Sequence, residues 1–347
     1  MKFNKKLITL VLFFGLILTS CGSNKTNSKT NTDKIIIRVG HNQSQKHPTH
    51  LGLIAFEKYI EDNLGDKYDV QVFPSELLGS QTDMVQLTQT GAINICVASN
   101  AILETFDNVY EIFNLPYLFV SPESYHHIMD DKSITNPIFT STKDAGFEAV
   151  TWLDAGSRSF YTKDRPIESA NDLKGLKIRV QQSPTNVKMM SLLGSSASPM
   201  GFGEVYTALQ AGIIDGAENN EMSLTDNGHG DICKYYSYDM HQMVPDIVIA
   251  NYDWLNKLPE KDRKVFEEGF KILNETQRKE WVIAVENAKK KAANEQGVEF
   301  IYPDQNEFVK KVAPLTDEVL KRNTKLQPYY KAIQKYNKEY PAKKEIE

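Results

Sequence analysis

Segments typical of strands and segments typical of helices alternate along this chain, and the alternation occurs twice. The first series has strands at residues 35–40, 69–73 and 93–98 and helices at 51–63 and 80–90. The second has strands at 158–162 and 176–180 and helices at 183–193 and 204–211. This order predicts a mainly parallel sheet with both faces covered by helices. The repeated series indicates two α/β lobes of related build.

A helix followed by a glycine and an apolar segment occurs in both series. The first helix ends at Gly91 and the second at Gly212, and each glycine is a good C-terminal cap. About 313 residues follow residue 34, which is enough for two domains with separate cores.

Residues 259–297 differ from the rest of the chain because they form one long, charged, amphipathic stretch. Its apolar positions are spaced as on one helix face, and they are Phe266, Phe270, Leu273, Trp281 and Ala284. We expect a single helix long enough to contact both lobes. The tail at residues 327–347 is rich in Lys and Tyr, which predicts a surface helix with a frayed end.

The first twenty residues have the layout of a secretory signal peptide. Three lysines precede an apolar run at residues 7–18, which is too short to span a bilayer. A small residue, Ser20, then precedes Cys21, as in a bacterial lipobox in which the cysteine is lipidated. The alternative is an ordinary signal peptide with a chance cysteine. The polar residues 22–34 favour the lipobox, since they are typical of a flexible tether.

Charge and cysteine content exclude several classes of protein. Removing residues 1–20 takes away three Lys and no acid, so the net charge of −5 becomes about −8. The sequence has no basic stripe of the kind that would indicate a nucleic-acid partner. Cys96 and Cys233 allow one disulfide but no disulfide framework, and the apolar surroundings of Cys96 favour a buried free thiol.

Signatures of catalysis are missing from the sequence. It contains no G-x-S-x-G elbow, no H-E-x-x-H pair and no P-loop. Pro48 separates His47 from His50, so these two do not form a helical metal-binding pair. A zinc site therefore has no support, and we expect neither a metal nor a cofactor. A pair of carboxylates for glycoside chemistry stays open, because acidic residues are plentiful and none stands in a motif.

Two arginines lie within predicted strands, at Arg158 and Arg179. Charged residues avoid strands that are covered on both faces. Each guanidinium therefore needs either a nearby acidic partner or a crevice that holds an anion. A guanidinium matches a carboxylate through two parallel hydrogen bonds. The residues alone leave both alternatives open.

Residues 202–219, FGEVYTALQAGIIDGAEN, resemble a long and specific string in the solute-binding proteins of TRAP (tripartite ATP-independent periplasmic) transporters, the DctP family. Residues 114–119, NLPYLF, and residues 74–79, PSELLG, are similar to two further stretches of that family. The resemblance extends over residues 35–325. It implies a two-lobe α/β fold like that of periplasmic binding proteins (class II type), with a long helix across both lobes, and a receptor that is not an enzyme.

The resemblance also implies which side chains bind the ligand. Arg179 matches the arginine that holds the ligand carboxylate, and Arg158 matches a second pocket arginine. Asn219 matches a pocket asparagine and Phe202 an aromatic lining position. The remaining matches lie in the first lobe and vary with the ligand among family members; they are Asn42, Gln81 and Ser99.

Departures from the family pattern narrow the range of expected ligands. Sialic-acid binders of the family carry an acid where Ser99 stands, which argues against sialic acid. Residues 216–220, 233–237 and 241–246 are similar to the branch that binds sugar acids such as glucuronate and galacturonate. C4-dicarboxylates are the main rival ligands. Two other functions stay open: a secreted, lipid-anchored hydrolase of sugar acids, and a sensor that presents ligand to a membrane kinase.

The expected organisation follows from these points. We expect a signal peptide at residues 1–20 and a lipidated Cys21 with its tether at 21–34. Lobe 1 would comprise residues 35–155 and about 245–284, lobe 2 residues 156–244 and about 285–325, and the tail residues 326–347. The protein would be an exported monomer, lipid-anchored at the outer face of the cytoplasmic membrane. Its partners would be a small organic acid and the TRAP membrane permease.

Overall fold

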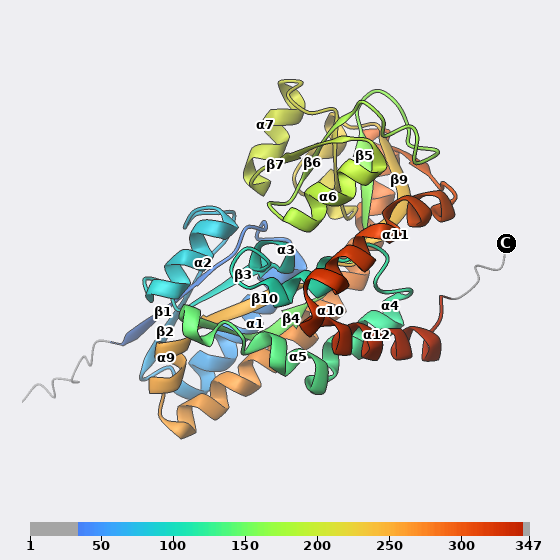
Figure 1. The fold of residues 1–347 in the computed structure, drawn as a ribbon. Helices are drawn as coiled ribbons and strands as arrows, with labels where there is room; N and C mark the ends of the chain where they lie inside the picture. Colours follow the sequence, from blue (N-terminus) through green and yellow to red (C-terminus); the bar gives the residue numbers. More distant parts are fainter. Residues whose placement is uncertain (1–33, 343–347) are drawn as a thin grey trace, which may run out of the picture. The chain divides into compact units, whose positions relative to one another are not determined.

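Two mixed β-sheets form the centres of two lobes in the computed structural model, which describes residues 34–342 (Figure 1). The predicted signal peptide, Cys21 and the tether up to residue 33 lie outside the described residues. No helix within residues 34–342 combines the length and the apolar run that a membrane crossing requires. Cys96 and Cys233 are both buried free thiols, and burial raises the pKa of each to about 12.

The first lobe contains a five-stranded sheet with the order β2-β1-β3-β10-β4. Its strands are β1 (Ile35–Gly40), β2 (Tyr68–Phe73), β3 (Ile95–Ser99), β4 (Phe147–Leu153) and β10 (Asp246–Asn251). β1 is parallel to β2 and β3, whereas β10 is antiparallel to β3 and β4. Four of the five strands thus run in the same direction, which confirms the prediction of a mainly parallel sheet, and β10 is the exception. β4 leaves the lobe at the edge where β10 returns, so β10 has to run in the opposite direction.

Helices cover both faces of this sheet. They are α1 (Pro48–Leu64), α2 (Gln81–Thr90), α3 (Asn100–Leu103), α4 (Pro122–Asp130), α5 (Lys132–Phe139) and α9 (Tyr252–Lys257), with 3₁₀ turns η1 (Asn108–Asn114) and η2 (Lys143–Ala145). The ends of α2 follow from its sequence. Ser80 and Asp83 form a capping box at its start, and Gly91 ends it with a φ of 76°.

The second lobe contains a six-stranded sheet with the order β11-β9-β5-β8-β6-β7. Its strands are β5 (Arg158–Thr162), β6 (Lys177–Val180), β7 (Ser196–Pro199), β8 (Gly216–Asn219), β9 (Tyr235–Gln242) and β11 (Glu299–Ile301). β8 begins at Gly216 and not directly after Gly212 as expected. Gly216 lies so close to β5 that a Cβ atom there would come within 2.4 Å of the Tyr161 carbonyl oxygen.

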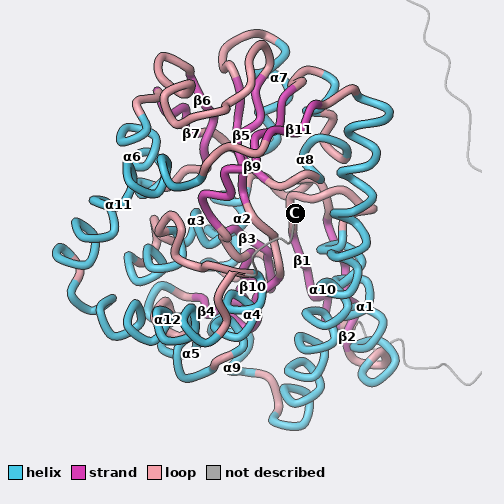
Figure 2. The backbone as a smooth tube through the Cα atoms, turned by 90° about the vertical axis from the view of Figure 1, so that its right-hand side faces the viewer, coloured by secondary structure: helices cyan, strands magenta, loops and turns pink. Residues whose placement is uncertain are grey.

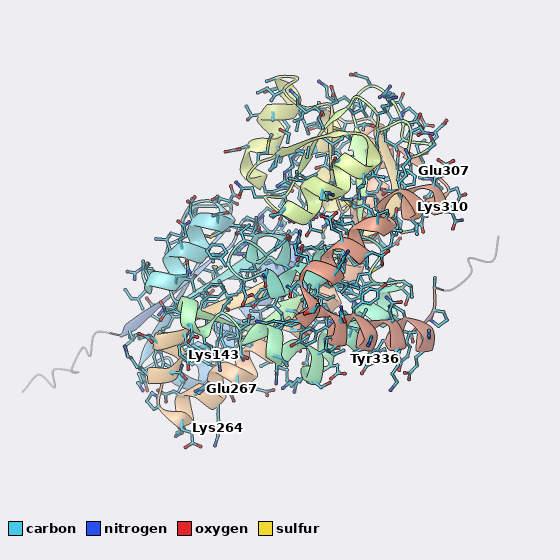
Figure 3. All side chains as sticks on the ribbon, viewed as in Figure 1. Lys143, Lys264, Glu267, Glu307, Lys310 and Tyr336 are labelled. Atoms are coloured by element: carbon cyan, nitrogen blue, oxygen red, sulfur yellow. The ribbon has the colours of Figure 1, made fainter. Side chains whose placement is uncertain are left out.

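The helices of the second half of the chain are mostly short. They are α6 (Pro184–Leu193), η3 (Phe202–Glu204), α7 (Val205–Gln210), α8 (Met222–Thr225), η4 (His229–Asp231), α11 (Gln305–Arg322), η5 (Thr324–Leu326) and α12 (Gln327–Glu339). The predicted helix in the tail is α12, which packs on α4 of the first lobe. Asn337 of α12 donates a hydrogen bond to the Leu118 carbonyl at 2.8 Å, and Figure 3 shows Tyr336 on the same helix.

One helix, α10 (Glu260–Gln296), contacts both lobes, as the sequence predicts. Figure 2 shows it beside α1, and further along it packs against α8 of the second lobe. Its buried face stacks Phe270 on Phe56 of α1 at 5.1 Å between ring centroids. Charged side chains such as Lys264 and Glu267 lie on its exposed face (Figure 3).

Helix α10 is also bonded to the segment where the chain first crosses between the lobes. The Asn274 amide donates to the Trp152 carbonyl at 2.6 Å. Gln277 bonds both the N–H and the carbonyl of Asp154, at 3.0 and 2.7 Å. β4 ends at Leu153 and β5 begins at Arg158, while β9 ends at Gln242 and β10 begins at Asp246. We propose that the lobes divide within these two crossings, at 155/156 and 244/245.

Gly52 lies where α1 packs against α10, so its substitution tests how closely the two helices must pack. A Cβ atom at this position would come within 2.8 Å of the Leu273 carbonyl oxygen and 3.0 Å of the Gln277 Cβ. We expect Gly52→Ala to lower the free energy of unfolding by about 1–3 kcal/mol, despite a gain of about 1 kcal/mol in helix propensity. Urea unfolding followed by circular dichroism measures this change. The exposed Lys58→Ala on the same helix should change stability by less than about 1 kcal/mol, and a more stable Gly52→Ala would contradict the close packing.

Candidate functional site

A polar pocket lies between the two lobes and is lined by residues from both. Six of the seven predicted ligand-binding residues line it, namely Asn42, Gln81, Arg158, Arg179, Phe202 and Asn219. They converge because the segment after β1, the end of β6 and the end of β8 all reach the same cleft. This is the region outside the carboxyl ends of parallel strands, where α/β proteins bind ligands.

Arg179 is buried on β6 and has no acidic partner in an ion pair among the described residues. Its Nε and Nη2 atoms donate to the Met200 carbonyl at 3.2 and 2.9 Å. Its Nη1 atom is buried and finds no hydrogen-bond partner in the described part of the chain. The guanidinium lies 5.7 Å from the centre of the Phe202 ring, a cation–π contact. Burial lowers the pKa of Arg179, as expected for a charge that lacks compensation.

Arg158, by contrast, is bonded through each of its three guanidinium nitrogen atoms to neighbouring protein groups. Its Nε atom pairs with the Glu218 carboxylate, its Nη1 donates to the Asn219 Oδ1 at 2.8 Å, and its Nη2 donates to the Glu218 carbonyl at 2.8 Å. Burial alone would raise the pKa of Glu218, but Arg158 and His241 lower it to about 2. Three of the five N–H groups of Arg158 are thus engaged, and its charge is neutralised.

Asn42 enters the pocket from a loop that histidines hold in place. The Gln43 N–H donates to His41 Nδ1 at 3.2 Å, and His41 Nε2 lies 3.0 Å from His50 Nδ1. Burial lowers the pKa of His41 to about 3, so the ring is neutral. The Oδ1 atom of Asn42 is buried and has no hydrogen-bond partner among residues 34–342.

Ser99 is the one predicted residue that does not line the pocket. It is buried at the end of β3, where its N–H donates to the Gln81 Oε1 at 3.3 Å. Its hydroxyl accepts the Ala101 N–H at 3.4 Å and caps α3. Ser99 therefore helps to position Gln81 through its backbone N–H.

Several lining residues were not predicted, and Gln181 and Asp246 matter most among them. Gln181 follows β6 directly, and its Oε1 atom is buried without a hydrogen-bond partner in the part of the chain that the structure describes. Asp246 begins β10 and forms no ion pair within the described residues. Burial raises its pKa from 3.8 to about 6, although the Arg158 charge opposes this. Their position in the sequence could have identified them, because each lies at the end of a predicted or observed strand that meets the cleft.

The unpaired atoms indicate what the pocket can bind. Arg179 offers a charged donor, whereas Asn42, Gln181 and Asp246 offer acceptors. Buried polar groups are normally hydrogen-bonded, so these atoms require a polar partner. A molecule with a carboxylate and several hydroxyl groups supplies both kinds of bond. Among residues 34–342, no cluster of three or more His, Cys, Asp or Glu side chains is arranged to hold a metal ion.

Comparison with known proteins agrees with this fold. The profile of the DctP family, described as bacterial extracellular solute-binding protein, family 7, matches residues 39–323. The protein YiiZ of Salmonella typhimurium is 38% identical over 299 residues, which cover 86% of this chain and 91% of YiiZ.

Two solved structures are close relatives. A TRAP periplasmic solute-binding protein from Anaerococcus prevotii, solved with bound α/β-D-glucuronate, is 80% identical with a TM-score of 0.88, covering 89% of this chain and 100% of that one. Another from Xanthobacter autotrophicus, solved with β-D-galacturonate, is 30% identical with a TM-score of 0.82, covering 86% and 98%. The chain therefore belongs to the DctP family of bacterial extracellular solute-binding proteins, which serve TRAP transporters.

Proposed function

We propose that this protein captures a uronate, D-glucuronate or D-galacturonate, outside the cytoplasm and delivers it to a TRAP membrane permease. The observation that carries the proposal is the buried Arg179 guanidinium, which has a free Nη1 atom and no acidic partner within the described residues. The Anaerococcus prevotii relative binds glucuronate. Because the family consists of solute-binding proteins, the protein is a receptor and not a hydrolase.

The carboxylate of the ligand would lie against Arg179. A bound carboxylate would give Nη1 its missing acceptor and would neutralise a charge that is buried at a cost. Phe202 covers the guanidinium from one side and keeps water from it. Arg158 would contribute through its two remaining N–H groups and by orienting Asn219.

The other lining groups favour a sugar acid over a C4-dicarboxylate. Asn42 Oδ1 and Gln181 Oε1 lack hydrogen-bond donors, and sugar hydroxyls are donors. A second carboxylate has only acceptor atoms, and it would meet Asp246 as a like charge. The other arginine that lines the pocket, Arg158, could not neutralise this second carboxylate, because Arg158 is already paired with Glu218. A ligand with one carboxylate and several hydroxyls fits each of these groups.

Capture would proceed by closure of the two lobes. The pocket takes residues from both lobes, so a ligand contacts all of them only when the lobes are together. Ligand then binds the closed state more tightly than the open one, and this difference drives closure. Exclusion of water strengthens the charged contacts, since the local dielectric constant falls. The receptor returns the ligand unchanged.

Removal of Arg179 tests the proposed function. We expect wild type to bind D-glucuronate or D-galacturonate with one-to-one stoichiometry in calorimetry, and succinate at least about tenfold more weakly. Arg179→Ala should weaken uronate binding by about 10²–10³-fold, because the ligand charge loses its buried partner. The apo variant should be at least as thermally stable as wild type. Arg165→Ala, an exposed arginine in the same lobe, is the control. Unchanged uronate affinity in Arg179→Ala would refute the carboxylate site.

Asp246 should reduce stability in the absence of ligand. Its pKa is higher in the folded state, about 6, than the ordinary 3.8, so its ionised form disfavours folding above pH 6. We expect Asp246→Asn to stabilise the apo protein at pH 7.5 by about 3 kcal/mol, with the gain disappearing as the pH falls from 6 towards 4. Thermal melting across this pH range measures the effect. The exposed Asp66→Asn should show no such trend, and a pH-independent gain would contradict the assignment.

We further propose that lipid on Cys21, which lies outside the described residues, anchors the receptor beside its permease. The proposal rests on the sequence around Cys21, and anchoring would raise the local concentration of the two partners. Cys21→Ala should move the protein from the membrane fraction to the soluble fraction and leave uronate binding unchanged in calorimetry. Retention in the membrane fraction would count against lipidation, and lost binding would count against separate roles for anchor and pocket.

A further inference from the structure

The loop between β2 and α2 has an unusual backbone at two consecutive positions. Ser75 and Glu76 have φ values of 54° and 59°, in the left-handed region that residues with a Cβ seldom adopt. Two backbone hydrogen bonds hold the loop there: the Ser75 N–H donates to the Gln43 carbonyl at 3.0 Å, and the Glu76 N–H donates to the His41 carbonyl at 3.1 Å. The loop is thus attached on both sides of Asn42, which lines the pocket.

This backbone directs the Glu76 side chain across the cleft. Glu76 belongs to the first lobe, and its carboxylate lies against Gly203 of the second lobe. A Cβ atom at Gly203 would come within 2.3 Å of the Glu76 Oε2. Burial raises the pKa of Glu76, while the Gly203 N–H, as a hydrogen-bond donor, and the nearby Arg179 charge lower it. The carboxylate therefore packs closely on Gly203, and the backbone N–H of Gly203 favours its ionised form.

The position of this contact links it to the pocket. Gly203 follows Phe202, which lines the pocket and stacks on Arg179. Another hydrogen bond between the lobes joins the Thr82 Oγ1 to the Gln182 Oε1 at 3.2 Å, and Gln182 lines the pocket. Neither residue of the Glu76–Gly203 contact lines the pocket. The contact requires the lobes to be close together, since Glu76 belongs to one lobe and Gly203 to the other.

We propose that Glu76 is a positioning residue that latches the receptor shut, through the close packing of its carboxylate against Gly203 of the other lobe. The inference rests on the proposed function, because the latch acts on a captured uronate. Glu76 would slow release of the ligand without touching it. Association would change little, since the contact forms only after the lobes close. Gly203 is required because any larger residue would displace the carboxylate.

Stopped-flow binding of D-glucuronate separates the two rate constants. We expect Glu76→Ala to raise koff by about 5–10-fold and to leave kon within about twofold. Glu76→Asn tolerates the left-handed backbone but is too short to reach Gly203, so it should match Glu76→Ala and exclude a misfolded loop as the cause. Glu76→Gln keeps an acceptor oxygen and should restore part of the slow release. Leu77→Ala, an exposed neighbour, is the control for general disturbance of the loop.

A double-mutant cycle tests the contact itself. Gly203→Ala should raise koff as Glu76→Ala does, whereas the double variant should be no worse than either single variant. Additive effects, an unchanged koff in Glu76→Ala, or tighter binding in that variant would each overturn the latch. Failure of wild type to bind any uronate would instead overturn the proposed function, and the latch with it. The two failures are therefore distinguishable.

Discussion

Two arginine side chains of the second sheet are buried where the sheet meets the pocket. The pocket depends on which groups surround each guanidinium. Removing a charge from water costs several kcal/mol unless other groups compensate for it. Arg158 is compensated by Glu218 and Asn219, which lie on the neighbouring strand β8. Within residues 34–342, Arg179 has only the Met200 carbonyl as a hydrogen-bond partner. Arg179 is held in place by strand β6, and we propose that its uncompensated charge receives the carboxylate of the ligand.

The pocket and the crossings between the lobes are built from the same segments. Ala155 lies in the first crossing and Asp246 directly follows the second, and both line the pocket. Helix α10 bonds Trp152 and Asp154 beside the first crossing. A change of angle between the lobes must therefore alter the pocket walls. This arrangement explains how a small ligand can affect the position of two whole lobes, because it contacts the place where they are joined.

The unsatisfied groups in the pocket come at a cost to the unliganded protein. Asp246 is ionised at neutral pH although it is buried, and Asn42 and Gln181 have polar atoms without partners. Binding sites commonly lower stability in this way, since groups arranged for a ligand are not arranged for one another. The left-handed backbone at Ser75 and Glu76 is a further strained feature next to the cleft.

Most elements with strong local signals were predictable. Strand β1 and strand β5 begin and end where the sequence indicates, and α10 extends over the predicted stretch. The two arginines stood out because a charge within a covered strand needs an explanation. The sequence did not separate their surroundings, however. Strand register decides which groups surround each arginine. Ser159, next to Arg158, pairs with Asn219. Arg179 pairs with Ala217 and Ser198, neither of which carries a charge.

The sequence by itself determined the α/β class, the long helix, the family resemblance and the arginine expected to hold a carboxylate. These follow from local periodicity, from capping residues and from one long motif. Only the tertiary structure decided that Arg158 is neutralised, that Ser99 stands behind Gln81, that Asp246 lines the pocket and that Glu76 reaches Gly203. The physical reason is that strand register and the meeting of two lobes bring together residues far apart in the chain, and no local pattern encodes those distances.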